Sequence, residues 1–127
     1  MPGKVADASI IAAVAFREPR AQEALHLIDG YELFEPPLLA YELASVCLKK
    51  IRLQPQSEDK MLQILEDTLS SVPFVWMQTD HPVAVGIALE TGLSVYDAAY
   101  LQLARQLGVP LVTFDERLER SFKDNVK

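Results

Sequence analysis

The sequence lacks the features that would stabilise a chain covalently or hold it in a membrane. It contains one cysteine, Cys47, which excludes a disulfide scaffold. Its longest mostly apolar run, residues 8–16, is far shorter than the ~20 residues that a membrane-spanning helix needs. Residues 1–4 also lack the apolar segment and cleavage site of a secretory signal. We therefore expect a cytoplasmic protein with no membrane span.

Basic residues are scarce as well. Twelve Lys and Arg oppose eighteen Asp and Glu, and the formal net charge of −6 disfavours binding of nucleic acid through bulk positive charge. Apolar residues are plentiful, because 50% of the 127 residues are hydrophobic, which excludes a disordered chain and is enough for a core. No repeat, low-complexity tract or linker divides the sequence, so we expect a single domain over residues 1–127.

Short apolar segments alternate with amphipathic helical patterns. Strands are expected at 4–6, 31–34, 74–77 and 109–113, and helices at 8–14, 20–29, 38–53, 96–107, after Ser57, between Asp80 and Gly92, and after Asp115. This alternation predicts an α/β fold with a parallel sheet covered by helices. Within it, Leu25 is expected to face inward and Trp76 to lie in the sheet core, and Ser57 and Asp80 are expected to cap the helices that they precede.

Three carboxylates lie where a predicted strand passes into a helix or in the first helical turn. Asp7 and Asp115 each end an apolar strand, and Asp97 is the third residue after Ser94, the expected N-cap. Ligands of open α/β sheets gather at the carboxyl ends of the strands. Taken singly, each acid also suits a structural role, because Asp caps helices and interacts favourably with the helix dipole.

Glu42 differs, because capping does not explain it. It lies inside the predicted helix 38–53, with Leu38, Leu39 and Val46 at neighbouring helical positions. An acid beside a core-facing stripe is costly unless something pairs with it. Two readings remain open: the carboxylate enters a site, or it lies at the edge of the stripe and reaches water or Lys49.

Convergence of Asp7, Glu42, Asp97 and Asp115 would have a strong electrostatic consequence. At a separation of ~4 Å and an effective dielectric of ~20, each pair of carboxylates repels by about 4 kcal/mol. Such a cluster must protonate, splay apart or bind cations, and oxygen ligands without nearby Cys or His select Mg²⁺ or Mn²⁺ over zinc. Carboxylate-held ions of this kind suit phosphodiester hydrolysis.

Two hydroxyls and a basic run are further candidates. Ser9 follows Asp7 by two residues and Thr113 precedes Asp115 by two, so their hydroxyls either orient carboxylates or make local turns. Three bases lie about two helical turns beyond Glu42. They either follow a phosphate backbone that enters the site or form a solvated helix end, and they are Lys49, Lys50 and Arg52.

Four segments resemble the motifs of PIN-domain ribonucleases, above all the VapC-type toxins of prokaryotic toxin–antitoxin pairs. They are VADAS at 5–9, YELASV at 41–46, YDAAY at 96–100 and VTFD at 112–115, in family order. The resemblance implies a PIN-like three-layer α/β fold, with a short, mainly parallel central sheet flanked by helices. It also implies a homodimer, an RNA substrate and a small antitoxin as partner.

For the site, the resemblance implies a Mg²⁺- or Mn²⁺-dependent endoribonuclease. The residues matching its catalytic and metal-binding acids are Asp7, Glu42, Asp97 and Asp115, and those matching its supporting hydroxyls are Ser9 and Thr113. Phe114 departs from the pattern, since it is bulkier than the small residue often found between the Thr and the Asp, and this would narrow access to the metals.

Two other classes of protein compete with an enzyme of this kind. A phosphoreceiver-like signalling domain needs a lysine late in the sheet to hold phosphate, but after Lys60 the only lysines are Lys123 and Lys127, beyond the last predicted strand. That class is excluded. A non-catalytic α/β interaction module whose acids only cap helices stays open, although the position of Glu42 speaks against it.

Overall fold

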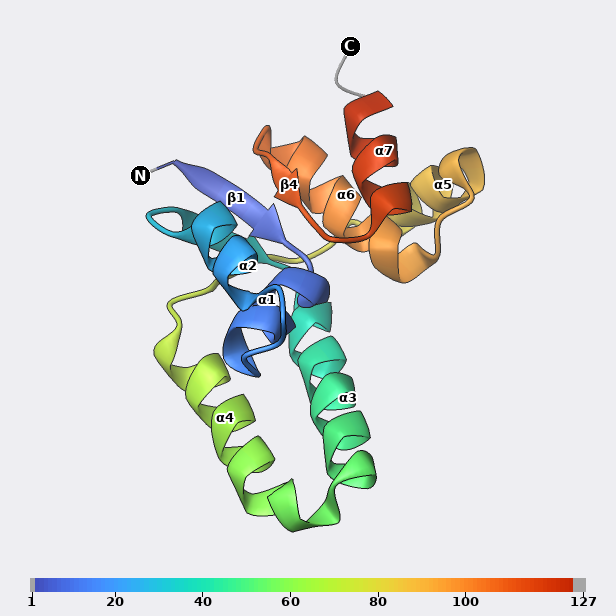
Figure 1. Cartoon of the computed structure of the whole chain (residues 1–127). Coiled ribbons are helices and arrows are strands. Elements are labelled where there is room, and N and C mark those ends of the chain that lie inside the picture. Colours follow the sequence, from blue (N-terminus) through green and yellow to red (C-terminus); the bar gives the residue numbers. More distant parts are fainter. Residues whose placement is uncertain (1, 125–127) are drawn as a thin grey trace.

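The computed structural model describes residues 2–124, which form a four-stranded sheet with helices around it (Figure 1). The strands are β1 (Gly3–Ala6), β2 (Glu32–Glu35), β3 (Val75–Trp76) and β4 (Leu111–Val112). Their order is β3-β2-β1-β4, and each neighbouring pair is parallel. The expected α/β class is therefore confirmed.

Helices connect the successive strands, as parallel pairing requires. They are α1 (Ala8–Ala15), α2 (Ala21–Ile28), α3 (Leu38–Leu53), the short 3₁₀ helix η1 (Pro55–Ser57), α4 (Glu58–Ser71), α5 (His81–Thr91), α6 (Val95–Leu107) and α7 (Glu116–Asp124). The strands β3 and β4 are shorter than expected, because β3 lies at the edge of the sheet and β4 pairs only with the last two residues of β1. Among residues 2–124, no helix is long and apolar enough to cross a membrane.

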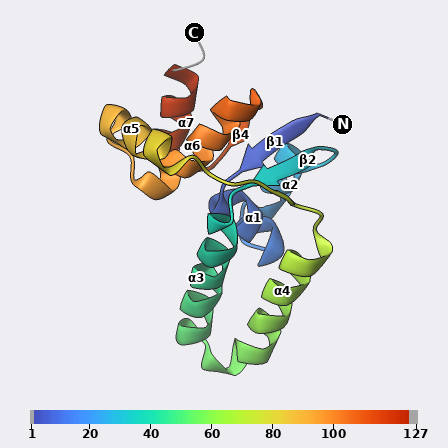
Figure 2. The same cartoon turned by 180° about the vertical axis from the view of Figure 1, so that it is seen from behind.

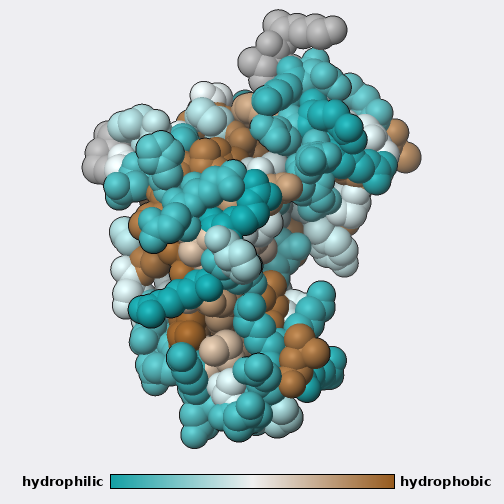
Figure 3. All heavy atoms as spheres, in the orientation of Figure 1, coloured by the Kyte–Doolittle hydropathy of each residue, from teal (hydrophilic) through white to brown (hydrophobic). Residues whose placement is uncertain are grey.

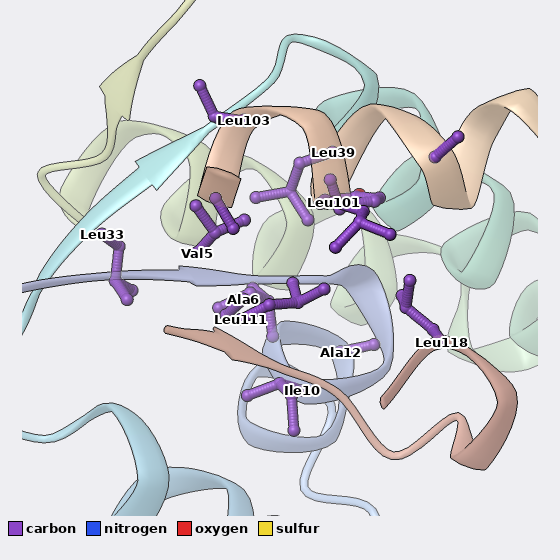
Figure 4. Close-up of a cluster of buried hydrophobic side chains, with 14 of the residues drawn as sticks. Val5, Ala6, Ile10, Ala12, Leu33, Leu39, Leu101, Leu103, Leu111 and Leu118 are labelled. Carbon is purple, nitrogen blue, oxygen red and sulfur yellow. The ribbon is translucent and has the colours of Figure 1, made fainter. Parts of the chain in front are cut away.

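The strand order reverses its direction at β1. From β1 the chain runs outward to β2 and β3, and it then returns to the other side of β1 as β4. The helices α1 and α6 accordingly lie on opposite faces of β1 and β4 (Figure 4). Open α/β sheets bind ligands where the strand order reverses. In this fold that point lies between the carboxyl ends of β1 and β4.

The core lies between the sheet and these helices. Val5 of β1, Ile10 of α1 and the α6 residues Leu101 and Leu103 are each 0% exposed, and Figure 4 shows them gathered around β1. Full burial of an aliphatic side chain of this size contributes about 1.5–3 kcal/mol. Cys47 on α3 is also buried and acts as a small apolar residue.

The helices α3 and α4 run side by side and project away from the sheet (Figures 1 and 2), and we call this pair the α3–α4 arm. Figure 3 shows hydrophobic surface interspersed with polar surface over this arm. The exposed large apolar residues of its two helices are Tyr41, Leu48, Leu53 and Leu62. Glu42 lies at the sheet end of the arm, and the basic run 49–52 lies near its tip.

Two expected burials and one expected cap are wrong. Leu25 is 44% exposed, because the buried face of α2 is centred on Ala24 and Leu25 lies beside it. Trp76 is 42% exposed, because β3 is an edge strand. Ser57 precedes α4 without capping it, since its hydroxyl donates to the carbonyl of Gln54 at 2.7 Å and closes η1. The expected caps Asp80 and Ser94 are confirmed.

Candidate active site at the carboxyl edge of the sheet

Asp7 directly follows β1, and its carboxylate receives three hydrogen bonds. Oδ1 accepts from the backbone N–H of Ser9 at 3.1 Å and from the Ser9 hydroxyl at 2.5 Å. Oδ2 accepts from the Thr113 hydroxyl at 2.5 Å, across 106 residues of sequence. Burial raises the pKa of Asp7, and the hydrogen bonds oppose that rise. Asp7 is thus both the N-cap of α1 and a buried partner of the β4 end.

The two hydroxyls that hold Asp7 are themselves oriented by backbone amides. Ser9 Oγ accepts from the N–H of Phe114 at 3.0 Å, and Thr113 Oγ1 accepts from the N–H of Asp115 at 2.9 Å. Because an amide N–H only donates, each hydroxyl is left to donate its own proton to Asp7. The segment after β4 is therefore fixed against the end of β1. The local turns that were the alternative interpretation of Ser9 and Thr113 are present too. The Ser9 N–H donates to Asp7, and the Asp115 N–H donates to the Thr113 hydroxyl.

Asp115 begins α7 and is exposed. Its Oδ1 accepts from the backbone N–H groups of Arg117 at 2.9 Å and Leu118 at 3.0 Å, which is the bonding of an N-cap. Oδ2 receives no hydrogen bond from any residue between 2 and 124. The structural reading and the site reading are therefore compatible, since capping occupies one oxygen and leaves the other open.

Glu42 points toward α6. Its Oε1 accepts from the hydroxyl of Tyr100 at 2.5 Å, and Tyr100 is 0% exposed. Burial is the main cause that raises the pKa of Glu42, the charges of Asp7 and Asp97 add to it, and the bond from Tyr100 lowers it. Burial followed by the charge of Glu42 also raises the pKa of Tyr100, so the phenol stays protonated and donates. The alternative interpretation, in which the Glu42 carboxylate reaches Lys49, is therefore wrong.

Asp97 lies in the first turn of α6, where its N–H donates to the Ser94 hydroxyl at 3.1 Å. Burial raises the pKa of its carboxyl, and the charge of Asp115 raises it further. The positive charge of Arg117 nearby lowers the pKa of Asp97. The Arg117 guanidinium is held in place by the carbonyl of Gly92, to which it donates at 2.7 Å.

These acids form one electrostatic set, because Asp7 and Asp97 act on Glu42 and Asp115 acts on Asp97. As their side chains stand, however, no three His, Cys, Asp or Glu within residues 2–124 are grouped closely enough to hold a metal ion. The expected tight cluster is thus absent in this arrangement of the side chains. By chemistry, carboxylate and hydroxyl oxygens fit a hard divalent cation.

Sequence reasoning missed Glu35, which ends β2 and is 0% exposed. Its Oε2 accepts from the N–H of Ala6 at 3.1 Å, while Oε1 has no partner in the part of the chain that the structure describes. Burial raises its pKa well above the usual value, and the charge of Asp7 adds to this. Asp7 was selected because it is an acid at the carboxyl end of a predicted strand. The same criterion selects Glu35 if the strand predicted at 31–34 is extended by one residue.

In the basic run, Lys50 is bound to another part of the protein, whereas Lys49 and Arg52 are exposed. Lys50 pairs with Glu18 at 2.9 Å, and its ammonium lies 5.5 Å from the ring centroid of Phe16, so it is bound to the segment that follows α1. Lys49 and Arg52 are exposed near the tip of the α3–α4 arm.

Comparison with known proteins identifies the family to which the chain belongs. The PIN-domain model matches residues 4–122, almost the whole chain. The chain belongs to the PIN-domain family. This PIN domain is 34% identical over 122 residues to the protein named Ribonuclease VapC3 of Pyrobaculum aerophilum, and the alignment covers 93% of each chain. The resemblance expected from the four sequence motifs is confirmed.

Solved structures match the same fold. The crystal structure of PAE2754 from Pyrobaculum aerophilum gives a TM-score of 0.76 at 27% identity, covering 96% of this PIN domain and 87% of that chain. Mycobacterium tuberculosis VapC20, described as a toxin that cleaves the sarcin–ricin loop, gives 0.65 at 14% identity, covering 94% and 95%. The PIN-like fold, with its parallel sheet flanked by helices, is therefore confirmed.

Proposed function

We propose that this PIN domain is a Mg²⁺- or Mn²⁺-dependent endoribonuclease, the toxin of a VapBC-type toxin–antitoxin pair. The observation that carries the proposal is the electrostatic connection of four acids, in which the charges of Asp7 and Asp97 act on Glu42 and the charge of Asp115 acts on Asp97. The 34% sequence identity to the protein named Ribonuclease VapC3 supports RNA as the substrate. In this proposal residues 1–127 act as one domain in the cytoplasm, form a homodimer and are inhibited by a small antitoxin.

The four acids would hold the metal through the oxygens that the fold leaves open. Capping commits Oδ1 of Asp115 and leaves its Oδ2, and Tyr100 binds only Oε1 of Glu42. Ser9 and Thr113 fix the orientation of Asp7 by donating to its two oxygens. A bound divalent ion supplies activation of the attacking water and stabilisation of the leaving oxygen.

The test is a Mn²⁺ titration of the melting temperature together with an RNA cleavage assay. Wild type should gain melting temperature with Mn²⁺ and cleave RNA, and Asp97→Asn should lose both responses. Asp80→Asn is the matched control, because Asp80 caps α5 by accepting from Val83 at 3.2 Å and Asn caps about as well as Asp. RNA cleavage by Asp97→Asn at the wild-type rate would refute the assignment.

The same experiment addresses the remaining alternative. An interaction module whose acids only cap helices would show no melting response to Mn²⁺ in wild type, Asp97→Asn or Asp80→Asn. It would also leave RNA intact in all three.

For the RNA backbone we propose contacts with Lys49 and Arg52, joined by Lys50 when its bond to Glu18 opens. Neutralised phosphates make affinity depend on salt. Removing Lys49 and Arg52 together should lower the slope of log affinity against log salt by about 0.7 for each residue, as for single strands. Lys123→Ala is the control, since this exposed lysine pairs with Glu119 on α7. An unchanged slope in the double variant would contradict these contacts.

A further inference from the structure

Glu35 is the most deeply buried carboxyl group in the part of the chain that the structure describes, at 0% exposed. It lies at the end of β2, and its Oε1 has no hydrogen-bond partner among the described residues. A buried carboxyl that leaves one oxygen unpaired opposes folding, because its desolvation is incompletely compensated. Stability of the fold therefore does not explain why a Glu is present here.

Its other oxygen continues the connection between β1 and β2 after their backbone pairing ends. The two strands are in register at Gly3 with Glu32 and at Lys4 with Leu33. At Ala6, where the next rungs would follow, the N–H donates to the Glu35 side chain at 3.1 Å. The backbone carbonyl of Glu35 meanwhile accepts from Met77 at 2.9 Å. Glu35 is thus anchored to β3 by its backbone and to β1 by its side chain.

This link joins the chain positions that deliver two of the four acids. Asp7 follows Ala6 directly in the sequence. On the other side, Pro36 and Pro37 connect Glu35 to the start of α3, which carries Glu42. Proline fixes φ, so the connection from Glu35 to α3 is stiff. The distance between the backbones that carry Asp7 and Glu42 consequently depends on the bond from Ala6 to Glu35.

We propose that Glu35 is a positioning residue of the active site, whose Oε2 holds the Ala6 amide and thereby sets the backbone of Asp7 relative to α3. This inference rests on the proposed metal-dependent function. It assigns Glu35 no contact with metal or RNA. Its effect reaches the metal through the placement of Asp7 and Glu42, as outer-shell partners of metal ligands do.

Two substitutions separate the reach of the Glu35 side chain from its acidity. Glu35→Gln keeps an oxygen acceptor at the same reach and removes the acid, whereas Glu35→Asp keeps the acid and is one methylene too short to reach Ala6. Glu32→Asp is the matched control, because Glu32 lies at the opposite end of the same strand.

The readouts are Mn²⁺ affinity and the kcat and KM of RNA cleavage. Glu35→Gln and Glu32→Asp should stay within about threefold of wild type, and Glu35→Asp should lose about tenfold or more in Mn²⁺ affinity and kcat with KM little changed. Wild-type behaviour of Glu35→Asp would overturn the proposal, and so would equal losses in Glu35→Gln and Glu35→Asp.

Amide hydrogen exchange of the wild type tests the same link without a variant, and it decides the matter if the variants do not fold. The Ala6 amide should be protected as strongly as that of Val5, which donates to the Pro110 carbonyl at 2.9 Å. Rapid exchange at Ala6 would refute the link to Glu35. A wild type that neither binds Mn²⁺ nor cleaves RNA would instead refute the proposed function, whatever the exchange at Ala6.

Discussion

The hydroxyl of Thr113 donates to Oδ2 of Asp7 at 2.5 Å and accepts from the backbone N–H of Asp115 at 2.9 Å. One buried side chain therefore connects the acid that follows β1 with an acid beyond β4. The two acids come from opposite ends of the chain, and Thr113 fixes how they face each other. Residues of this kind support a site without contacting its substrate.

Replacing Thr113 with Val removes that hydroxyl at nearly constant volume. One buried and one part-buried hydrogen bond are lost, so the free energy of unfolding should fall by about 1–3 kcal/mol, measured by urea denaturation. Mn²⁺ affinity should fall about tenfold, because Asp7 loses one of its orienting donors. Thr113→Ser keeps the hydroxyl and should retain the affinity. A Thr113→Val protein with wild-type Mn²⁺ affinity would show that this bond does not matter for the metal.

Tyr100→Phe tests the support of Glu42. The Tyr100 hydroxyl lowers the pKa of Glu42 by hydrogen bonding, so its removal should raise that pKa further. Mn²⁺ needs the ionised carboxylate, and the midpoint of Mn²⁺ binding against pH should move upward. Stability should fall by about 1 kcal/mol. An unchanged pH midpoint in Tyr100→Phe, with binding followed calorimetrically, would separate Glu42 from the metal.

Two glycines of the α5 region should respond to alanine in opposite directions. Gly92 ends α5 at φ 76°, and an added Cβ would lie 2.9 Å from the Arg117 guanidinium. Gly92→Ala should therefore destabilise the protein by about 1 kcal/mol or more. Gly86 lies within α5, and a Cβ added there would meet no other atom within 4 Å outside the helix backbone, so Gly86→Ala should stabilise by about 0.5–1 kcal/mol. Thermal denaturation of both variants checks the sign, and a destabilising Gly86→Ala would contradict the local geometry.

The buried acids predict how stability depends on pH. Burial raises the pKa values of Asp7, Glu42 and Asp97 in the folded protein. A carboxyl with a raised folded pKa contributes stability that is present below its unfolded pKa and is lost as pH rises through the folded one. Without divalent ions, the melting temperature should therefore increase as pH is lowered from about 7 to about 5.

Mn²⁺ competes with protons for the same oxygens, so its stabilising effect should shrink over that pH range. Asp97→Asn carries one such acid fewer and should show a weaker pH dependence in metal-free buffer. Melting curves with chelator and with Mn²⁺ across the range provide the measurement. A metal-free melting temperature that falls steadily on acidification would contradict the raised pKa values.

Several parts of the site could be read locally. Asp7 and Asp115 each follow an apolar strand segment, and strand ends are visible in sequence as a change from apolar to polar residues. Their capping role could be predicted from the same positions, because Asp is favoured directly before a helix. Ser94 was identified as the cap of α6, which placed Asp97 in the first turn.

Other parts depended on distant neighbours. Glu35 was missed because strand β2 extends one residue beyond the predicted segment, and only the approach of Ala6 gives its carboxyl a partner. The direction of Glu42 depended on Tyr100, which lies 58 residues further along the chain. The exposure of Trp76 followed from the position of β3 at the edge of the sheet. Sequence periodicity carries no information about any of these three relationships.

The succession of strands and helices along the chain, the family motifs, three acids at the ends or first turns of elements and Glu42 inside a helix could all be read from the sequence, because propensity, capping and apolar periodicity act within a few residues. The tertiary structure decided which of these acids share an edge, which hydroxyl holds which oxygen and which carboxyl is buried. Those outcomes follow from strand order and helix packing, which bring residues 29 to 106 positions apart into hydrogen-bond contact. Contacts over such separations depend on the whole fold.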